Sequence, residues 1–355
     1  MNTISLELIK KLPKVELHCH LDGSLRINSI IDIAKKNKVK LPAYEPKQLS
    51  KLISLNKQKI SLEDYIALFD ITLSVLQDED ALDRISYELM EDLNSDNVYY
   101  AEIRFSPILH TKNGMTIEDA LNAVQKGLNR GAKEYGIKYG IIICGIRSID
   151  PLISIELAEL AVKFKNNGVV GFDLAGAEYN YPAKKHKEAF YIIRNNNVNT
   201  TVHAGEAFGP QSIHQAIHTC GANRIGHGIR LKEDPELLSY INNHRICLEI
   251  CLTSNYHTGA VESIKEHPFK YYYEKGIRVS LNTDNRLISN TNLSKEYFLA
   301  SQLFNLDLKD IREIIIMSMK SSFIPHQKRK QMIKNISNEL ENDFGIVSAL
   351  SLIHI

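Results

Sequence analysis

Cysteine is scarce in this chain, and no two cysteines stand in a C-x-x-C spacing. There are five, an odd number: Cys19, Cys144, Cys220, Cys247 and Cys251. Neither a disulfide framework nor a cysteine zinc site is therefore indicated.

An excess of charge of one sign is also absent. The chain has 43 Lys and Arg residues against 42 Asp and Glu residues, a net charge of +1, so no global field attracts nucleic acid or a membrane. No apolar run is long enough to span a bilayer, and the N-terminus has an early acid and no apolar segment of the signal-peptide kind. We expect a cytoplasmic protein that binds neither nucleic acid nor membranes, and no particular oligomeric state is indicated.

Repeats, low-complexity tracts and Pro/Ser-rich linkers are absent as well. Instead, a short apolar run followed by a longer amphipathic stretch recurs along the chain, and runs such as GIIIC at 140–144 suit a parallel strand buried on both faces. The predicted strands are 15–19, 98–105, 139–146, 169–174, 199–203, 224–226, 246–252 and 277–282. Eight strands alternating with helices favour an α/β fold, a (β/α)8 TIM barrel that occupies 1–355 as one domain.

One connection departs from this pattern. About eighty residues separate the first strand from the second, far more than one crossover helix needs, and we place an insertion at about 41–78. Within it Ser61 is a predicted N-cap followed by early acids. The next apolar residues fall on one helix face: Leu62, Tyr65, Ile66 and Phe69. This helix either packs on the barrel or forms an apolar lid over its mouth; the stretch 307–345 is predicted to be helical and to cover the barrel.

Polar residues end the first, fifth, sixth and eighth predicted strands. The stretches are His18-Cys19-His20, His203-Ala204-Gly205-Glu206, Gly226-His227-Gly228 and Asn282-Thr283-Asp284-Asn285. Histidines at i and i+2 share one face of a strand, and the carboxyl ends of barrel strands meet where catalytic groups gather. Three histidines and an aspartate would form a mononuclear zinc shell, with a glutamate and a further histidine left for acid–base work.

Each stretch has a simpler explanation when taken alone. A pair such as His18 and His20 arises by chance in a chain with 13 histidines, and His203 can be an ordinary core residue. The glycines beside His227 can serve a turn, and Asp284 can cap a helix. We favour the metal site because all these explanations would have to hold together at one barrel mouth.

A second histidine pair has helical spacing. His214 and His218 are four residues apart, which could bind a metal on a helix, but no Glu follows the first histidine as in a zincin. The opposite face of this helix is apolar, with Ile213, Ala216, Ile217 and Cys220. We therefore expect the pair to be exposed to solvent.

The chain resembles the adenosine deaminase family over nearly its full length. The resemblance rests on six ordered motifs: KVELHCHLDG at 14–23, YAEIRFSP at 100–107, GFDLAG at 171–176, HAGE at 203–206, GHG at 226–228 and SLNTD at 280–284. It implies a (β/α)8 barrel and one zinc ion per chain held by His18, His20, His203 and Asp284. It implies catalytic roles for Glu206, His227 and Asp284, with substrate at His20, Asp22, Gly176 and Asn285 and, in our interpretation, at the lid residues Leu62, Tyr65 and Phe69.

The expected chemistry agrees with this resemblance. Zinc lowers the pKa of water towards about 7; His227 is expected to direct that nucleophile to C6 of the purine, and Asp284 to accept its proton. Glu206 must be protonated so that it can donate to ring N1, which a dry pocket favours. Asn285 stands where many family members have a second aspartate, and Arg286 follows where they often have proline. This change concerns substrate choice more than reaction type.

The alternatives concern the metal count and the substrate. Two-metal barrel hydrolases resemble this chain less, because the fourth strand carries no lysine. The base-flipping deaminases are also a poor match, because no P-C-x-x-C follows any H-x-E. Adenosine and deoxyadenosine are the first expectation, as substrates of a hydrolase acting on a cyclic amidine C–N bond in purine salvage. Rivals are adenine, or a nucleoside with a modified 5′ group read by Arg26, Arg147 or Arg286. A remote alternative is a non-catalytic binding protein.

Overall fold

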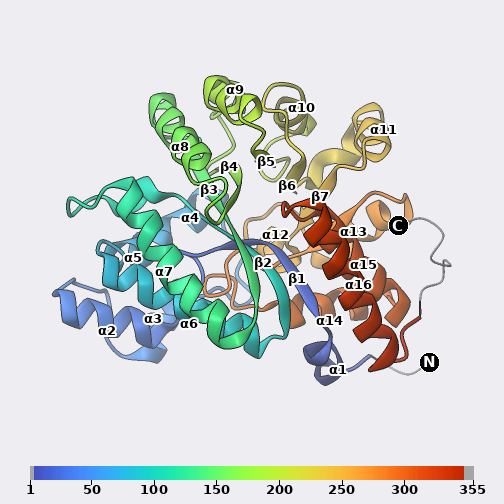
Figure 1. Cartoon of the computed structure of the whole chain (residues 1–355), viewed down its shortest axis with the longest axis horizontal. Coiled ribbons are helices and arrows are strands. Elements are labelled where there is room, and N and C mark those ends of the chain that lie inside the picture. Colours follow the sequence, from blue (N-terminus) through green and yellow to red (C-terminus); the bar gives the residue numbers. More distant parts are fainter. Residues whose placement is uncertain (1–3, 348–355) are drawn as a thin grey trace.

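The computed structural model describes residues 4–347 (Figure 1). Eight parallel strands pair in chain order, from β1 to β8. They are β1 (Lys14–His20), β2 (Val98–Phe105), β3 (Lys138–Ile146), β4 (Val169–Ala175), β5 (Asn199–Ala204), β6 (Arg224–His227), β7 (Cys247–Ile250) and β8 (Val279–Leu281). The eight predicted strands are all present, and the largest differences are that β7 and β8 are shorter than expected.

Residues just beyond β8 close the barrel. The backbone N–H of Asp284 donates to His18 O at 2.8 Å, and the N–H of His20 donates to Asp284 O at 2.7 Å, so Cys19 and Asp284 form a parallel bridge between the first and last strands. The predicted (β/α)8 barrel is confirmed, and its closing seam lies at three of the predicted metal ligands, His18, His20 and Asp284.

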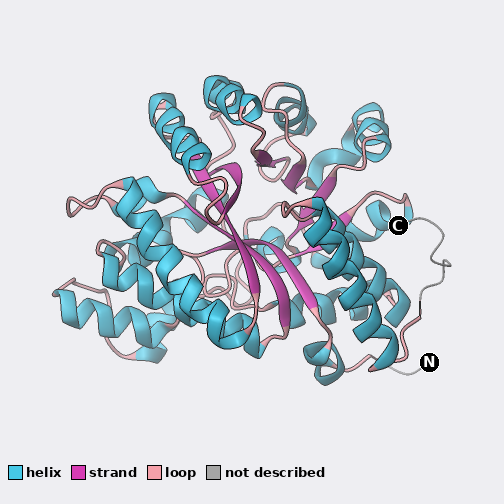
Figure 2. Cartoon of the chain, viewed as in Figure 1, coloured by secondary structure: helices cyan, strands magenta, loops and turns pink. Residues whose placement is uncertain are grey.

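Helices surround the strands on the outside (Figure 2). Those after β2 are α7 (Ile117–Tyr135), α8 (Pro151–Lys163), α9 (Lys187–Asn195), α10 (Pro210–His218), α11 (Pro235–Asn243), α12 (Leu252–His257), α13 (Phe269–Glu274), α14 (Leu293–Phe304), α15 (Leu308–Ser321) and α16 (His326–Asn342). The last two lie in the stretch predicted to be helical at 307–345, and α15 packs against β1 and β8. Because all strands run in parallel, their carboxyl ends meet on one side of the barrel.

The connection between β1 and β2 carries the expected extra helices. It contains α2 (Ile27–Asn37), α3 (Pro46–Ile53), α4 (Leu62–Ala67), α5 (Phe69–Val75) and α6 (Glu79–Ser95). Ser61 caps the N-terminus of α4 as predicted, because its Oγ accepts the backbone N–H of Asp64 at 3.0 Å. The expectation of one continuous helix through Phe69 is wrong. Leu68 N–H turns to Tyr65 O at 3.2 Å, a tighter i→i+3 turn that separates α4 from α5.

Within residues 4–347, no helix combines the length and the apolar character needed to cross a lipid bilayer. The five cysteines all lie in this described part of the chain and are buried free thiols.

Candidate active site

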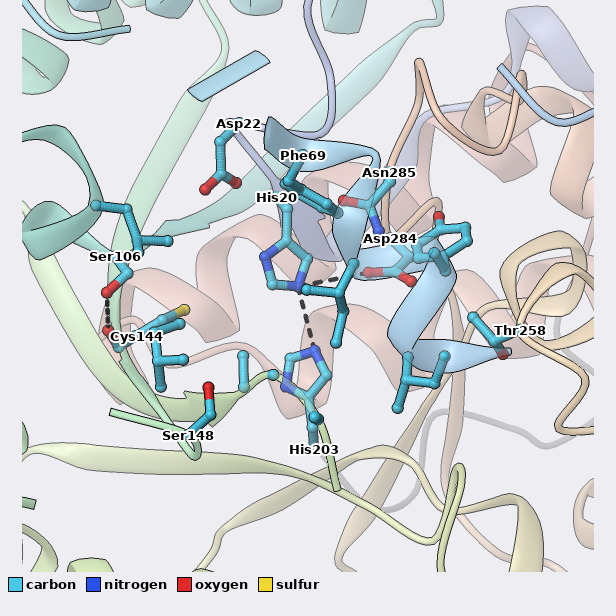
Figure 3. A pocket seen from close by; sticks show the side chains of 18 of the residues that line it. His20, Asp22, Phe69, Ser106, Cys144, Ser148, His203, Thr258, Asp284 and Asn285 are labelled. Carbon is cyan, nitrogen blue, oxygen red and sulfur yellow. Dashed lines mark hydrogen bonds and ion pairs between the residues drawn. The ribbon is translucent and has the colours of Figure 1, made fainter. Parts of the chain in front are cut away.

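Four metal-ligating side chains meet at the carboxyl ends of the strands. They come from β1, β5 and the turn after β8: His18, His20, His203 and Asp284. Their ligand atoms all lie within 4.8 Å of one another. Nε2 of His20 is 3.1 Å from Nε2 of His203 and 3.4 Å from Oδ1 of Asp284 (Figure 3).

Carboxylates behind the histidines fix the direction of their lone pairs. Nδ1 of His18 donates to Glu249 Oε2 at 2.8 Å, and Nδ1 of His203 donates to Asp173 Oδ2 at 3.0 Å. A carboxylate accepts only, so each Nδ1 carries the proton and each Nε2 turns a lone pair to the centre. This is the usual support of metal-binding histidines.

A buried arginine keeps both supporting carboxylates ionised. Arg104 donates to Asp173 at 2.9 Å and to Glu249 at 2.9 Å. Burial alone would raise the pKa of Asp173, but His203 and Arg104 outweigh it and lower that pKa. At Glu249 the charges of Arg104 and Arg224 likewise outweigh burial, and its pKa lies well below its usual range.

The centre brings together groups that repel one another unless a proton or a metal ion lies between them. Nε2 of His18 is fully buried, lacks a hydrogen-bond partner among the described residues, and lies 3.3 Å from Oδ1 of Asp284. When the ring of His18 is neutral with its proton on Nδ1, the lone pair on Nε2 faces a lone pair on Oδ1 of Asp284. Three imidazole nitrogens and one carboxylate oxygen are a donor set typical of zinc and similar divalent metals, so the residues fit a metal ion.

Two of the site residues adopt backbone conformations that side chains disfavour. His227 has φ 65° and Asp284 has φ 58°, the left-handed region that costs a non-glycine residue roughly 1–3 kcal/mol. In Asp284 this turn directs Oδ1 to the histidines, while Oδ2 accepts the Ser254 hydroxyl at 2.5 Å. The pKa of Asp284 lies well below its usual range because the nearby histidines outweigh burial.

Glu206 follows β5 and lies beside this centre. Its Oε1 accepts the Thr258 hydroxyl at 3.0 Å, and its Oε2 is 3.5 Å from Nε2 of His227. Burial, and then the charges of Asp284 and Glu178, raise the pKa of Glu206 to about 8. This shift favours the protonated carboxyl group, the form that can donate a proton.

His227 is held in its neutral form. It is buried at the end of β6, and burial together with the charge of His18 lowers its pKa well below the usual value. Its Nδ1 lies 2.9 Å from the side-chain nitrogen of Asn255, which donates to it. Nε2 therefore carries the proton of the neutral ring, on the side that faces Glu206.

A cavity of about 350 Å³ opens above these groups. All the residues predicted to contact substrate line it, together with Ile66: His20, Asp22, Leu62, Tyr65, Phe69, Gly176 and Asn285. The same cavity is lined by Glu206, His227, His203 and Asp284. The first βα connection therefore contributes an apolar wall, with Phe69 facing His20 (Figure 3).

Asp22 and Asn285 are the polar groups of this cavity without partners. Oδ1 of Asp22 and Oδ1 of Asn285 are buried and accept no hydrogen bond from residues 4–347. Burial raises the pKa of Asp22 to about 7. Asp22 is therefore available to a polar ligand, whereas Oδ1 of Asn285 lies against Gly23 and leaves the amide nitrogen of Asn285 for a ligand.

Other residues singled out in the sequence lie outside the site. His214 and His218 are exposed on α10, as expected. The three arginines considered for an acidic substituent are already bonded: Arg26 to Asp92 at 3.1 Å, Arg147 to His203 O at 2.6 Å, and Arg286 to Asp96 at 3.5 Å. In the described part of the chain, no lysine or arginine lines the cavity.

Several residues that support the site were not predicted. They are Asp173, Glu178, Glu249, Ser254, Asn255 and Thr258. Two of them could have been found from the sequence. Asp173 lies inside the motif at 171–176, and Glu249 is a charged residue in the otherwise apolar strand β7. Glu178, Asn255 and Thr258 lie in connections after the strands, where the sequence carries no periodic signal.

Comparison with known proteins agrees with this geometry. Residues 13–339 match the family model described as adenosine deaminase. The adenosine deaminase of Mycobacterium ulcerans is 41% identical over 349 residues, covering 94% of this chain and 96% of that protein. A probable adenosine deaminase of Dictyostelium discoideum is 44% identical over 321 residues, which are 90% of this chain but only 42% of that longer protein.

Solved structures have the same fold. An N6-mAMP deaminase of Arabidopsis superposes with a TM-score of 0.83 at 28% identity, covering 93% of this chain and 99% of that one. An amidohydrolase with bound Zn, from Burkholderia ambifaria, superposes with a TM-score of 0.88 at 21% identity, covering 95% and 93% of the two chains. At that identity the second likeness concerns the barrel alone.

Proposed function

Because the chain belongs to the adenosine deaminase family, we propose that it hydrolyses adenosine and deoxyadenosine to inosine and deoxyinosine, with release of ammonia. The observation that carries this proposal is that Glu206 and His227 face the same cavity as a metal-ligating group of three histidines and an aspartate. Relatives named adenosine deaminase, about 40% identical over nearly the whole chain, support it. The reaction would belong to purine salvage.

The cofactor we propose is one zinc ion per chain. His18, His20, His203 and Asp284 would hold it, and their nitrogen and oxygen donors suit that metal. A zinc ion there would supply Lewis-acid activation of a water molecule at neutral pH. The ionised Asp284 lies beside the same position and would also accept a proton from that water.

Protons reach the purine from Glu206 in this proposal. Oε1 of Glu206 accepts the Thr258 hydroxyl, so Oε2 is the atom that would carry the acidic hydrogen. That O–H would donate to ring N1 as C6 becomes tetrahedral, so that the aromatic ring need not carry a negative charge. The neutral His227 presents Nε2–H to the nucleophile and directs it at C6.

The cavity would hold the nucleoside by a few polar groups and an apolar wall. Asp22, with its unpaired buried oxygen, would accept a ribose hydroxyl. Gly176 would contact the purine through its backbone, and Asn285 would donate to N7. Leu62, Tyr65 and Phe69 would close over the base as a lid carried by the insertion at 41–78 within a single domain.

The charge of the cavity favours a nucleoside over a nucleotide. The Arabidopsis neighbour is named for a nucleoside monophosphate. Here no lysine or arginine of the described chain lines the cavity, and Asp70 lies at its edge. A 5′-phosphate would lose its hydration beside a carboxylate and gain no cationic partner.

The test is a panel of adenosine, deoxyadenosine, adenine and AMP, followed by ultraviolet absorbance for loss of the 6-amino group. We expect the two nucleosides to be turned over, with kcat/KM for AMP lower by more than about 10²-fold because its charge stays unpaired. Preference for AMP or adenine would overturn the proposed substrate. Turnover of none of the four would overturn the proposed reaction.

The proposed location is the cytoplasm, where cysteine thiols stay reduced, and the five free thiols are consistent with it.

A further inference from the structure

A chain of hydrogen bonds leads from a backbone amide to His227. The N–H of Phe269 donates to Nδ1 of His267 at 3.0 Å. Nε2 of His267 lies 3.2 Å from the side-chain oxygen of Asn255, whose nitrogen lies 2.9 Å from Nδ1 of His227. All four residues are buried, so water does not compete for these bonds.

Only one arrangement of protons gives every hydrogen bond in this series both a donor and an acceptor. A backbone N–H can donate but never accept, so Nδ1 of His267 must be unprotonated. Nε2 of neutral His267 then carries the proton and requires an acceptor, which must be the amide oxygen of Asn255. The amide nitrogen consequently faces Nδ1 of His227, and the proton of neutral His227 is placed on Nε2.

Burial keeps the ring of His267 neutral, so that only one of its two nitrogens carries a proton. Burial, and then the charge of Lys232, lower the pKa of His267 to about 3. Its ring therefore stays uncharged at any pH at which the enzyme would work, and its tautomer is decided by Phe269 alone.

We propose that Asn255 and His267 are positioning residues that lock His227 in the Nε2–H tautomer, so that it always presents a donor to the reacting centre. This inference rests on the proposed function for its consequence, but the tautomer itself is independent of activity. Without the lock, His227 could place its proton on Nδ1 and turn a lone pair towards the nucleophile. A wrong histidine tautomer can cost up to about 10⁴-fold in kcat.

The sharpest variant is Asn255→Asp, which keeps the shape and removes the donor. A carboxylate accepts only, so Nδ1 of His227 must then carry a proton. We expect kcat to fall by roughly 10²-fold or more, with zinc content retained and KM changed by less than about threefold.

Two substitutions at His267 separate the lock from simple packing. In His267→Gln an amide can accept the Phe269 N–H and still donate to Asn255, so kcat should stay within about tenfold of wild type. In His267→Phe the space of the imidazole ring is filled but the donor to Asn255 is lost. The amide group of Asn255 can then flip, and kcat should fall further than in the Gln variant. A packing role predicts the opposite order, because Phe fills the ring volume better.

The tautomer is read directly by long-range ¹H–¹⁵N NMR of the zinc-loaded protein labelled with [¹⁵N]histidine. Signals are assigned by their loss in His227→Gln and His267→Gln. Wild type should show unprotonated Nδ1 and protonated Nε2 at both His227 and His267, and Asn255→Asp should protonate Nδ1 of His227. His110, whose Nδ1 lies 2.9 Å from Leu76 O and so carries its proton there, is an internal reference that should not change.

The outcomes are distinct. Protonated Nδ1 at wild-type His227, or an unprotonated Nδ1 in Asn255→Asp, would overturn the lock even if the enzyme deaminates adenosine. The expected tautomers in a protein that turns over no purine would support the lock and overturn the proposed function instead. Equal kcat in His267→Gln and His267→Phe would refute the positioning role of His267.

Discussion

The carboxylate of Glu178 lies under the backbone of Glu206 and holds it in place. Its two oxygens accept the N–H groups of four consecutive residues, from Gly205 to Phe208, at 2.6 to 3.0 Å. Hydrogen bonds to an ionised group are about twice as strong as neutral ones. The same charge contributes to the raised pKa of Glu206. Glu178 therefore affects both the position and the protonation of the proposed acid.

We predict that Glu178→Gln weakens both effects. The amide nitrogen would face N–H donors, leaving at least one of them unpaired, which costs roughly 1–3 kcal/mol of unfolding free energy. Loss of the negative charge should also lower the pKa of Glu206 and move the alkaline limb of the kcat profile to lower pH. Thermal denaturation and a pH profile measure these effects, with Glu188→Gln on the exposed part of α9 as the control. An unmoved limb would show that Glu178 does not influence the acid.

Glu206 gives the wild-type enzyme its expected pH dependence. Its pKa is raised to about 8, so the protonated form is present below that value and is lost as the pH rises through it. A cation at the adjacent centre lowers this pKa, so kcat should decline from about pH 8 or below. Glu206→Gln should bind zinc and substrate, lose roughly 10²–10⁴-fold in kcat and show no such limb. Near-normal turnover by the Gln variant would assign the acid role to another residue.

The order of the barrel and the residues at its mouth could be predicted from local sequence, because His20 and His203 lie at the ends of β1 and β5 and Asp284 follows β8 by three positions. Each of these residues needs only its own strand to reach the centre. The lock on His227 could not be predicted, because Asn255 lies in α12 and His267 lies twelve positions later beyond that helix, so the two side chains meet only in the folded structure. The break at Leu68 was missed for a related reason, since periodicity places residues on a face and does not detect one tightened turn.

Removal of the metal should abolish activity reversibly. We predict about one zinc per chain by elemental analysis, loss of turnover on treatment with a strong chelator, and recovery on adding zinc. Alanine at His18, His20, His203 or Asp284 should lose both zinc and activity, because each removes one donor of a four-donor set. His214→Ala, on the exposed pair of α10, is the matched histidine control and should keep both. Full activity without metal, or a second essential metal, would contradict this prediction.

The apolar wall should affect substrate binding and leave the metal in place. Phe69 lines the cavity and faces His20 with ring centroids 6.5 Å apart. Phe69→Gln replaces apolar surface over the base with an amide, so KM for adenosine should rise by roughly tenfold while zinc content stays constant. Tyr65→Phe removes only the bond to Ser289 at 2.7 Å and should raise KM less. Unchanged KM in the Gln variant would mean that α5 merely packs on the barrel.

Asn285 and Gly23 should act as one unit in recognising the purine. A Cβ at Gly23 would lie 1.9 Å from Oδ1 of Asn285, so this amide oxygen rests against a backbone that only glycine provides. The oxygen is thereby turned to Gly23, and the amide NH2 is the group left to donate to N7 of the base. Asn285→Ala should therefore lose roughly 1–3 kcal/mol in kcat/KM for adenosine, the usual cost of a buried acceptor left unpaired. Asn285→Asp should remain active and become more pH-dependent, because its carboxyl group can donate to N7 only when protonated.

Gly23→Ala tests the same relationship without changing the amide itself. Its added methyl group must displace the Asn285 side chain, so this variant should lose about as much kcat/KM as Asn285→Ala. The double variant should lose little more than either single one, because residues in contact are not additive. The substrate comparison is adenosine against 7-deazaadenosine, which has no N7 acceptor. Wild type should prefer adenosine, and all three alanine variants should have lost that preference. If Gly23→Ala and Asn285→Ala have additive effects, or if the preference survives in both, then Asn285 does not contact N7 and its amide instead orients Asp284 in the neighbouring position.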